Sequence, residues 1–311
     1  MRSAPLLFAL VSVGCLSTDA LVPPTVDDDP ALPRLRVPGT LLHGEVHGSP
    51  GDPLVVLLHG GPGADHLGML RLLPLVDAGY QVLAYDQRGA GRSRRHDPGS
   101  FDAWSLTDDL AHLIDHHSPT GTAVLVGHSW GGQHAALAVQ EIPDRVEAVV
   151  FLDPGPWTDE RLDAMGLTAV DMSAPHLNDT MWAEQMVSPA DHARMDLRFQ
   201  ELMSGQLAGY RMSEVDVMPF ARMGYVSWGN VTAMGADGRG AADFDFAVGV
   251  DDWPGTAHFV WGGANQLMGP IYRADQEAPW PRATSLTLPG VGHDLVWVAA
   301  DDVTAHLLEV L

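Results

Sequence analysis

The feature that most constrains the fold is an alternation of short apolar stretches with helix-like segments over residues 34–154. Residues 53–60 read PLVVLLHG and residues 123–128 read AVLVGH, and such continuous apolar runs are typical of strands covered on both faces. Residues 105–117 have leucines at helical spacing, and Ser105 is the expected N-cap of that helix. We also expect a helix over about residues 67–78, and another that follows residues 123–128 and continues to about Glu141. Strands that alternate with helices predict an α/β protein with a mostly parallel sheet.

The alternation stops after residue 154 and resumes near residue 256, which predicts an insertion within a single large domain. We expect residues 34–154 and 256–311 to form the two parts of the core, and residues 155–255 to form a helical cap before the last two strands. The cap segment holds ten of the 13 methionines of the chain. These side chains either contact apolar ligands or fill the interior of the cap itself.

The first residues have the pattern of an export signal. Arg2 precedes an apolar run from Ala4 to Val13, which is too short to span a bilayer but has the length of a signal-peptide core. The run leads to SVGC, which resembles a bacterial lipobox, and Cys15 is the only cysteine. We therefore expect a signal or lipobox segment over 1–15, a flexible tether over 16–33, and an exported protein. It is either secreted or held at the cell envelope by lipidation of Cys15.

Charge and motif content limit the partners. A formal net charge of −23 argues against nucleic acid as a partner, because the protein would repel its phosphates. The sequence HGGPGADH lacks the G-x-G-x-x-G spacing of a dinucleotide site, so no cofactor is predicted. His112 and His116 lie four residues apart, but no third ligand is placed, so we interpret them as a solvated helix face and predict no metal. The expected partner is a small-molecule or short-peptide substrate.

The strongest chemical motif is GHSWGG at residues 127–132. It is a G-x-S-x-G match between a predicted strand and a predicted helix, which is the context of a nucleophile elbow, and it makes Ser129 the expected nucleophile. His293 lies in LPGVGHDL, after the last predicted strand and before the last predicted helix. That position predicts a general base toward Ser129 and then a general acid toward the leaving group.

A glycine-rich loop, HGGPG at residues 59–63, follows the buried strand of residues 53–60. Glycine has the backbone freedom that lets main-chain amides approach a substrate carbonyl. We expect the backbone N–H groups of Gly61 and Trp130 to hold the developing oxyanion. The rest of this oxyanion loop consists of His59, Gly60, Pro62 and Gly63.

Together with DQRGAGRS at residues 86–93, these motifs resemble the proline iminopeptidase group of α/β-hydrolases. The resemblance extends from about residue 35 to the end of the chain and is sharpest up to Asp153. It implies an α/β-hydrolase fold with a helical cap and a cofactor-independent Ser-His-acid hydrolase. In this group Asp86, Arg88 and Ser93 are expected to brace the loop rather than to react.

The catalytic acid departs from the family pattern. The family carries it after the next-to-last strand in G-x-x-D, but here WGGANQLMGP places Asn265 at that position. Asp153, at the end of the strand that follows the nucleophile helix, is the expected replacement, as in certain lipases and haloalkane dehalogenases. The predicted triad is therefore Ser129, Asp153 and His293. Two alternatives stay open: Asp-Pro-Gly is also a turn sequence, in which the aspartate bonds nearby backbone, and Asn265 is also a candidate to bond His293 or to line the pocket.

The substrate is less constrained than the reaction. Proline iminopeptidases recognise a free amine with cap glutamates, one of them in a Trp-Glu pair, and this cap has no clear Trp-Glu, which leaves Glu184 and Glu214 as candidates. We predict an exported serine hydrolase that forms an acyl-enzyme and is most like a prolyl aminopeptidase. A carboxylesterase or lipase-type hydrolase of small apolar acyl substrates is one alternative. A non-catalytic ligand-binding protein on a hydrolase fold is another.

Overall fold

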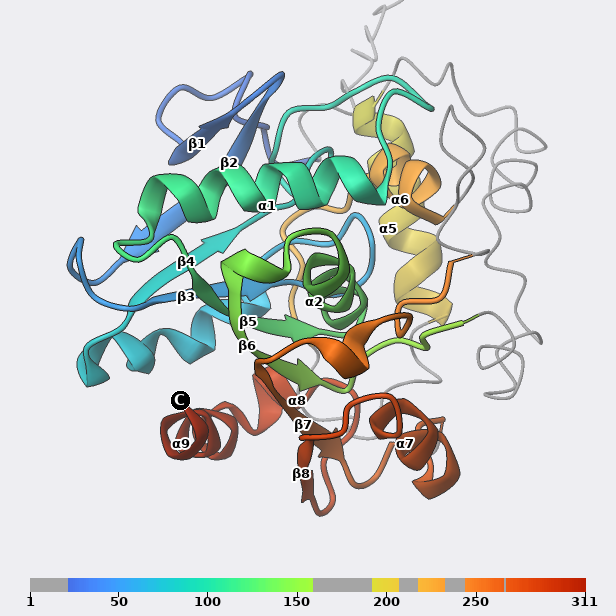
Figure 1. The fold of residues 1–311 in the computed structure, drawn as a ribbon. Coiled ribbons are helices and arrows are strands. Elements are labelled where there is room, and N and C mark those ends of the chain that lie inside the picture. The colour runs from blue at the N-terminus through green and yellow to red at the C-terminus, as the bar shows by residue number, and fades with distance from the viewer. Residues whose placement is uncertain (1–21, 159–191, 207–217, 233–243, 266) are drawn as a thin grey trace, which may run out of the picture.

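The computed structural model describes residues 22–158, 192–206, 218–232, 244–265 and 267–311. Its strands form one sheet in the order β1-β2-β4-β3-β5-β6-β7-β8 (Figure 1). β2 pairs antiparallel with β1 and β4, and the other neighbours are parallel, which confirms the predicted mostly parallel α/β sheet. The strands are β1 (Arg34–Val37), β2 (Thr40–His47), β3 (Leu54–Leu58), β4 (Gln81–Tyr85), β5 (Ala123–His128), β6 (Val146–Leu152), β7 (Thr256–Gly262) and β8 (Thr284–Leu288).

Helices cover both faces of the sheet (Figure 1). Successive side chains of a strand point to opposite faces, so Val56 and Leu58 of β3 pack in the core beside α1 and α2, while Val55 and Leu57 pack toward η2, α8 and α9. The helices are η2 (Leu67–Ala78), α1 (Ala103–His117), α2 (Trp130–Glu141), η3 (Pro143–Arg145), α5 (His192–Gln206), α6 (Tyr225–Thr232), η7 (Val250–Asp252), α7 (Pro270–Glu277), α8 (Leu295–Val298) and α9 (Ala300–Val310).

Two predicted helices differ in detail from expectation. The prediction that Ser105 caps the helix over 105–117 is wrong, because α1 begins at Ala103 and Asp102 is its N-cap. The Asp102 side chain accepts from the backbone N–H of Ser105 at 2.9 Å, and the Ser105 hydroxyl accepts from that of Asp102 at 3.3 Å, so the two residues form a capping box. The helix expected over 67–78 is present, but it is wound as a 3₁₀ helix and contains Pro74, which has no N–H to donate.

Residues 22–33, part of the expected tether, lie against the core and the cap. Val26 is buried, and its N–H donates to the carbonyl of Arg92 at 2.8 Å. Arg92 Nε donates to Pro24 O at 2.9 Å, and Arg222 Nη1 donates to Pro23 O at 2.8 Å. Buried side chains and paired backbone groups therefore hold this stretch, in contrast to the free extension that its composition suggested. Residues 1–21, with Cys15, lie outside the described residues, and no helix among those described is long and apolar enough to cross a membrane.

The chain between β6 and β7 contains α5 and α6, where the cap was expected. A buried carboxylate, Asp196 on α5, joins it to the core: Arg95 Nε and Arg222 Nε each lie 2.8 Å from Asp196 Oδ2. Met195 and Met223 pack with Phe199 in an apolar cluster, so these two methionines fill the interior of the cap. Glu184 and Glu214, the candidate amine ligands, lie outside the described part of the chain.

Candidate active site

Ser129 occupies a strained turn between β5 and α2. Its backbone has φ 54° and ψ −119°, a conformation that side-chain-bearing residues rarely adopt. The turn is held by hydrogen bonds on both sides: Ser129 N–H donates to Leu152 O at 3.1 Å, and Ser129 O accepts from the N–H groups of Gly132 at 2.9 Å and Gly155 at 3.1 Å. This strand–turn–helix geometry is that of a nucleophile elbow.

The glycines of the motif are required because the backbone segments touch. A Cβ on Gly131 would lie 2.0 Å from the carbonyl oxygen of Leu58, and one on Gly127 would lie 2.2 Å from that of Gly131. Both distances are far inside van der Waals contact. The turn that exposes Ser129 can therefore form only where these positions lack a side chain.

His293 lies in the loop between β8 and α8, and a neighbour of Ser129 holds this loop. His128 Nε2 lies 2.9 Å from the backbone oxygen of His293. Because a carbonyl only accepts, the proton of His128 resides on Nε2. Burial, followed by the nearby His293, lowers the pKa of His128 to about 3, so this donor is a neutral imidazole. The loop of His293 is thereby fixed beside the end of β5, where the nucleophile turn begins.

Asp153, directly after β6, is fully buried and also has a positive φ, 43°. Its Oδ2 lies 3.4 Å from His293 Nδ1, and its Oδ1 accepts from the backbone N–H of Gly262 at 2.8 Å. Gly262 is the last residue of β7. The carboxylate therefore reaches across to the neighbouring strand and toward the imidazole, which differs from the local bonding expected of an Asp-Pro-Gly turn.

Asn265 lies beside the carboxylate. Its Nδ2 donates to Asp153 Oδ2 at 2.9 Å, and its Oδ1 accepts from the N–H of Leu267 at 3.2 Å. The structure thus brings the residue at the family's acid position onto the expected replacement acid. This bond to Asp153 differs from both roles considered for Asn265, which were contact with His293 and lining of the pocket.

The oxyanion loop is tied to the nucleophile helix through Gln87, a residue that sequence reasoning did not single out. Gln87 Oε1 accepts from Trp130 Nε1 at 2.9 Å, while its Nε2 donates to His59 O at 3.2 Å. The backbone N–H of Gln87 donates to His59 Nε2 at 3.0 Å, so that nitrogen is unprotonated and His59 Nδ1 donates to Gly60 O at 2.9 Å. Burial lowers the pKa of His59 to about 4 and keeps this ring neutral.

Asp86 braces the same region, as the resemblance implied. Its Oδ1 accepts from the backbone N–H and Nδ1 of His66 at 2.9 and 2.7 Å, and its Oδ2 accepts from His43 Nδ1 at 2.8 Å and the N–H of Arg92 at 2.7 Å. Although burial alone would favour the neutral forms, the ion pair lowers the pKa of Asp86 well below its usual value and raises that of His66 to about 10. Ser93 Oγ adds a hydrogen bond to Asp86 O at 2.6 Å.

His43, His66 and Asp86 also lie close enough together to approach one metal ion. A cavity of about 270 Å³ adjoins them, next to Glu45 and Asp65. The four donors on the Asp86 carboxylate already occupy the directions in which a metal would bind its oxygens, and the raised pKa of His66 keeps a proton on that ring. The cluster therefore fits a buried ion pair that supports the loop.

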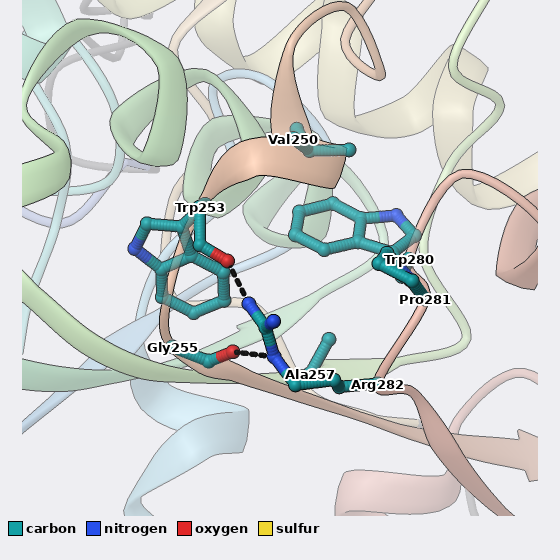
Figure 2. A pocket seen from close by; sticks show the side chains of 7 residues that line it. All are labelled: Val250, Trp253, Gly255, Ala257, Trp280, Pro281 and Arg282. Carbon is teal, nitrogen blue, oxygen red and sulfur yellow. Dashed lines mark hydrogen bonds between the residues drawn. The ribbon is translucent and has the colours of Figure 1, made fainter.

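Figure 2 shows a second, much smaller pocket, of about 10 Å³, lined by Trp253, Ala257, Trp280 and Arg282 among others. It lies at the beginning of β7, whereas Asp153 and Ser129 follow the ends of β6 and β5. Arg282 is one of the lining residues and donates to the carbonyls of Trp253 and Gly255 (Figure 2). A space of this size holds about one water molecule, so it offers no room for a substrate.

Comparison with known proteins agrees with this geometry. Residues 53–300 match the alpha/beta hydrolase fold family, and the chain belongs to that family. A segment of 110 residues is 43% identical to epoxide hydrolase A of Mycobacterium tuberculosis and covers 34% of this chain but only 33% of that enzyme. The solved proline iminopeptidase of Mycobacterium smegmatis is similar over 90% of this chain and 97% of its own, with TM-score 0.64 and 18% identity. An esterase from Exiguobacterium antarcticum has the same TM-score over 88% and 96%, with 16% identity.

These likenesses establish the family and the fold. The similarity to epoxide hydrolase A spans about a third of that enzyme's length, and the solved structures are too distant in sequence to carry an activity. One structural neighbour is an iminopeptidase and another is an esterase, so the comparisons assign the chain to the alpha/beta hydrolases in general and to no narrower group within them. The choice among their reactions depends on the residues of the site.

Proposed function

We propose that this protein is a serine hydrolase that forms an acyl-enzyme on Ser129, with His293 as general base and Asp153 as the acid. The observation that carries the proposal is the 3.4 Å separation of Asp153 Oδ2 and His293 Nδ1, in a loop that His128 fixes beside the nucleophile turn. This distance between the carboxylate and the imidazole is somewhat longer than a hydrogen bond. Such distances are common in catalytic sites without substrate and shorten when substrate binds.

The reaction follows from these positions. Ser129 Oγ attacks the substrate carbonyl while His293 Nε2 takes the hydroxyl proton, and the protonated ring then gives that proton to the leaving group. A water molecule, deprotonated by His293, then attacks the acyl-enzyme, and the carboxylic acid product leaves as Ser129 regains its proton from His293. Asp153, paired with Nδ1, holds the tautomer that leaves Nε2 free to accept and stabilises the imidazolium that forms.

The oxyanion is assigned to the backbone N–H groups of Gly61 and Trp130. Trp130 is the first residue of α2, and N–H groups in the first turn of a helix have no partner within the helix and carry partial positive charge. Gly61 has φ 48°, and its carbonyl accepts from Ala64 N–H at 2.7 Å, which turns the loop tightly at this point. Two such donors supply the stabilisation that acyl transfer needs.

We infer two substrate classes in order of preference. The resemblance of HGGPG, DQRGAGRS and GHSWGG to proline iminopeptidases favours aminopeptidase action on small N-terminal residues. The cap segment leaves the second class, esters of apolar acids, open, because it has no clear Trp-Glu pair to recognise a free amine. Gly224 N–H donates to Gly63 O at 2.7 Å, which holds the cap at the oxyanion loop.

The proposal is tested by active-site labelling. A fluorophosphonate probe should label the intact protein and fail to label Ser129→Ala, whereas equal labelling or none supports the ligand-binding alternative. Prolyl- and alanyl-p-nitroanilides measured beside short p-nitrophenyl esters then separate the two substrate classes.

Export and lipidation of Cys15 are a further part of the proposal. Mass spectrometry of the mature N-terminus tests them directly. The variant Cys15→Ser should lose membrane attachment and leave a soluble enzyme.

A further inference from the structure

We propose that Asn265 is a positioning residue for the catalytic acid: its side-chain amide fixes the direction of the Asp153 carboxylate, and thereby the geometry in which Asp153 pairs with His293. This inference rests on the proposed triad and assigns to Asn265 a role distinct from those of the acid and of a pocket-lining residue. It starts from the contact between Asn265 Nδ2 and Asp153 Oδ2 at 2.9 Å.

The orientation of the amide is determined by its partners at both ends. Oδ1 of Asn265 faces the backbone N–H of Leu267 at 3.2 Å, and Nδ2 faces the carboxylate. A flipped amide would place its NH₂ group against an N–H and its oxygen against a carboxylate oxygen, and both contacts would be repulsive. The donor must therefore point at Asp153.

The backbone of Asn265 is held by a hydrogen bond as well. Its N–H donates to Gly262 O at 2.9 Å, and Gly262 N–H donates in turn to Asp153 Oδ1 at 2.8 Å. Asn265 and Asp153 are both buried, with 3% and 0% of their surface exposed, so water does not replace these donors. The carboxylate thus has one fixed neutral donor on each oxygen, and the oxygen that Asn265 holds is the one that faces His293.

A neutral amide is the side chain that this arrangement requires. A carboxylate at position 265 would lie within hydrogen-bond distance of Asp153, and two carboxylates so close share a proton instead of both staying ionised. An apolar residue would leave Asp153 Oδ2 without its fixed donor in a buried site. Asparagine donates a hydrogen bond to Asp153 and adds no charge, which is consistent with a catalytic acid that follows β6 instead of β7.

The test measures hydrolysis of p-nitrophenyl acetate from pH 5 to 9 by wild type, Asn265→Leu, Asn265→Asp and Asp153→Asn, each first checked for native far-UV circular dichroism and melting temperature. Asn265→Leu should lower kcat by about 10- to 100-fold at nearly unchanged KM, as expected for loss of one hydrogen bond to a charged group. Asn265→Asp should move the acid limb of the kcat/KM profile to higher pH, because the two carboxylates must release their shared proton before Asp153 carries its full charge toward His293.

Asn230 supplies the matched control. It is likewise buried, and its Oδ1 accepts from Gly99 N–H at 2.6 Å, far along the chain from Asp153. Asn230→Leu and Asn230→Asp should lower the melting temperature without moving the acid limb. A kcat of Asn265→Leu within about threefold of wild type, or an unmoved acid limb in Asn265→Asp, overturns the positioning role. Wild-type turnover by Asp153→Asn would instead overturn the proposed triad, so the two failures are distinguishable.

Discussion

His128, the residue directly before Ser129, donates from Nε2 to the backbone carbonyl of His293 at 2.9 Å. The two residues are 165 positions apart, and their rings lie 4.7 Å from centroid to centroid. This single bond connects the turn that carries the proposed nucleophile with the loop that carries the proposed base. The x position of this G-x-S-x-G motif therefore has a structural role of its own.

Replacement of His128 by alanine should lower kcat, and by a larger factor than the same replacement at a matched control histidine. Without the donor, the loop of His293 is free to shift, and misplacement by about 1 Å can cost about 100-fold in rate. His134 on α2 is the control, because burial lowers its pKa to about 3 as well and it is also a buried, neutral imidazole. Steady-state kinetics on a p-nitrophenyl ester should show a loss of about 10- to 100-fold for His128→Ala and a much smaller one for His134→Ala. Equal losses would mean that cavity formation alone explains the effect.

Alanine at Gly131 should disrupt the nucleophile turn. The added Cβ would meet the backbone oxygen of Leu58, which cannot move as a flexible side chain would, and overpacking of this kind costs about 1–3 kcal/mol or more. Gly229→Ala is the control, since a Cβ there meets nothing within 4 Å and the residue lies in α6. Chemical denaturation should show a loss of stability for Gly131→Ala only, together with loss of fluorophosphonate labelling. Normal labelling of Gly131→Ala would contradict the geometry.

The ion pair between His66 and Asp86 should make stability depend on pH. The pKa of His66 is raised from 6.5 to about 10, so the folded state holds one proton more than the unfolded state between these values. The contribution is complete below about pH 6.5 and is lost as the pH rises toward 10. Thermal unfolding between pH 7 and 9.5 should therefore show a steeper decline for wild type than for His66→Gln. Parallel curves for the two proteins would refute the raised pKa.

Asp196 should be the main electrostatic anchor of the cap. It is 1% exposed and pairs with Arg95 and Arg222, so Asp196→Ala leaves two guanidinium groups buried without their carboxylate. Removal of one partner from a buried ion pair costs about 3–5 kcal/mol. Urea denaturation should show this loss, and limited proteolysis should cleave the variant between β6 and β7 faster than wild type. The same substitution at Asp115, whose pair with Arg145 is exposed, should change stability by less than about 1 kcal/mol.

Much of the fold was predictable because the signals are local. The apolar runs of β3 and β5 and the leucine spacing of α1 are each patterns of neighbouring residues, so each predicts its element without knowledge of the rest of the chain. The helix α2 likewise ends at Glu141, as the sequence indicates. The errors were local as well. Ser105 and Asp102 both have side chains that cap helices, and only the backbone geometry distinguishes the N-cap from the third helical position. Composition alone also did not show that residues 22–33 would pack against Arg92 and Arg222.

Sequence alone determined the alternating strands and helices and the glycine turn at Ser129, because periodicity and backbone sterics act over a few residues. Only the tertiary structure decided which polar groups meet. Asp153 and Asn265 are 112 residues apart, and they touch because β6 and β7 are neighbours in the sheet. A chain of hydrogen bonds between such distant residues depends on strand order, and strand order follows from packing of the whole molecule.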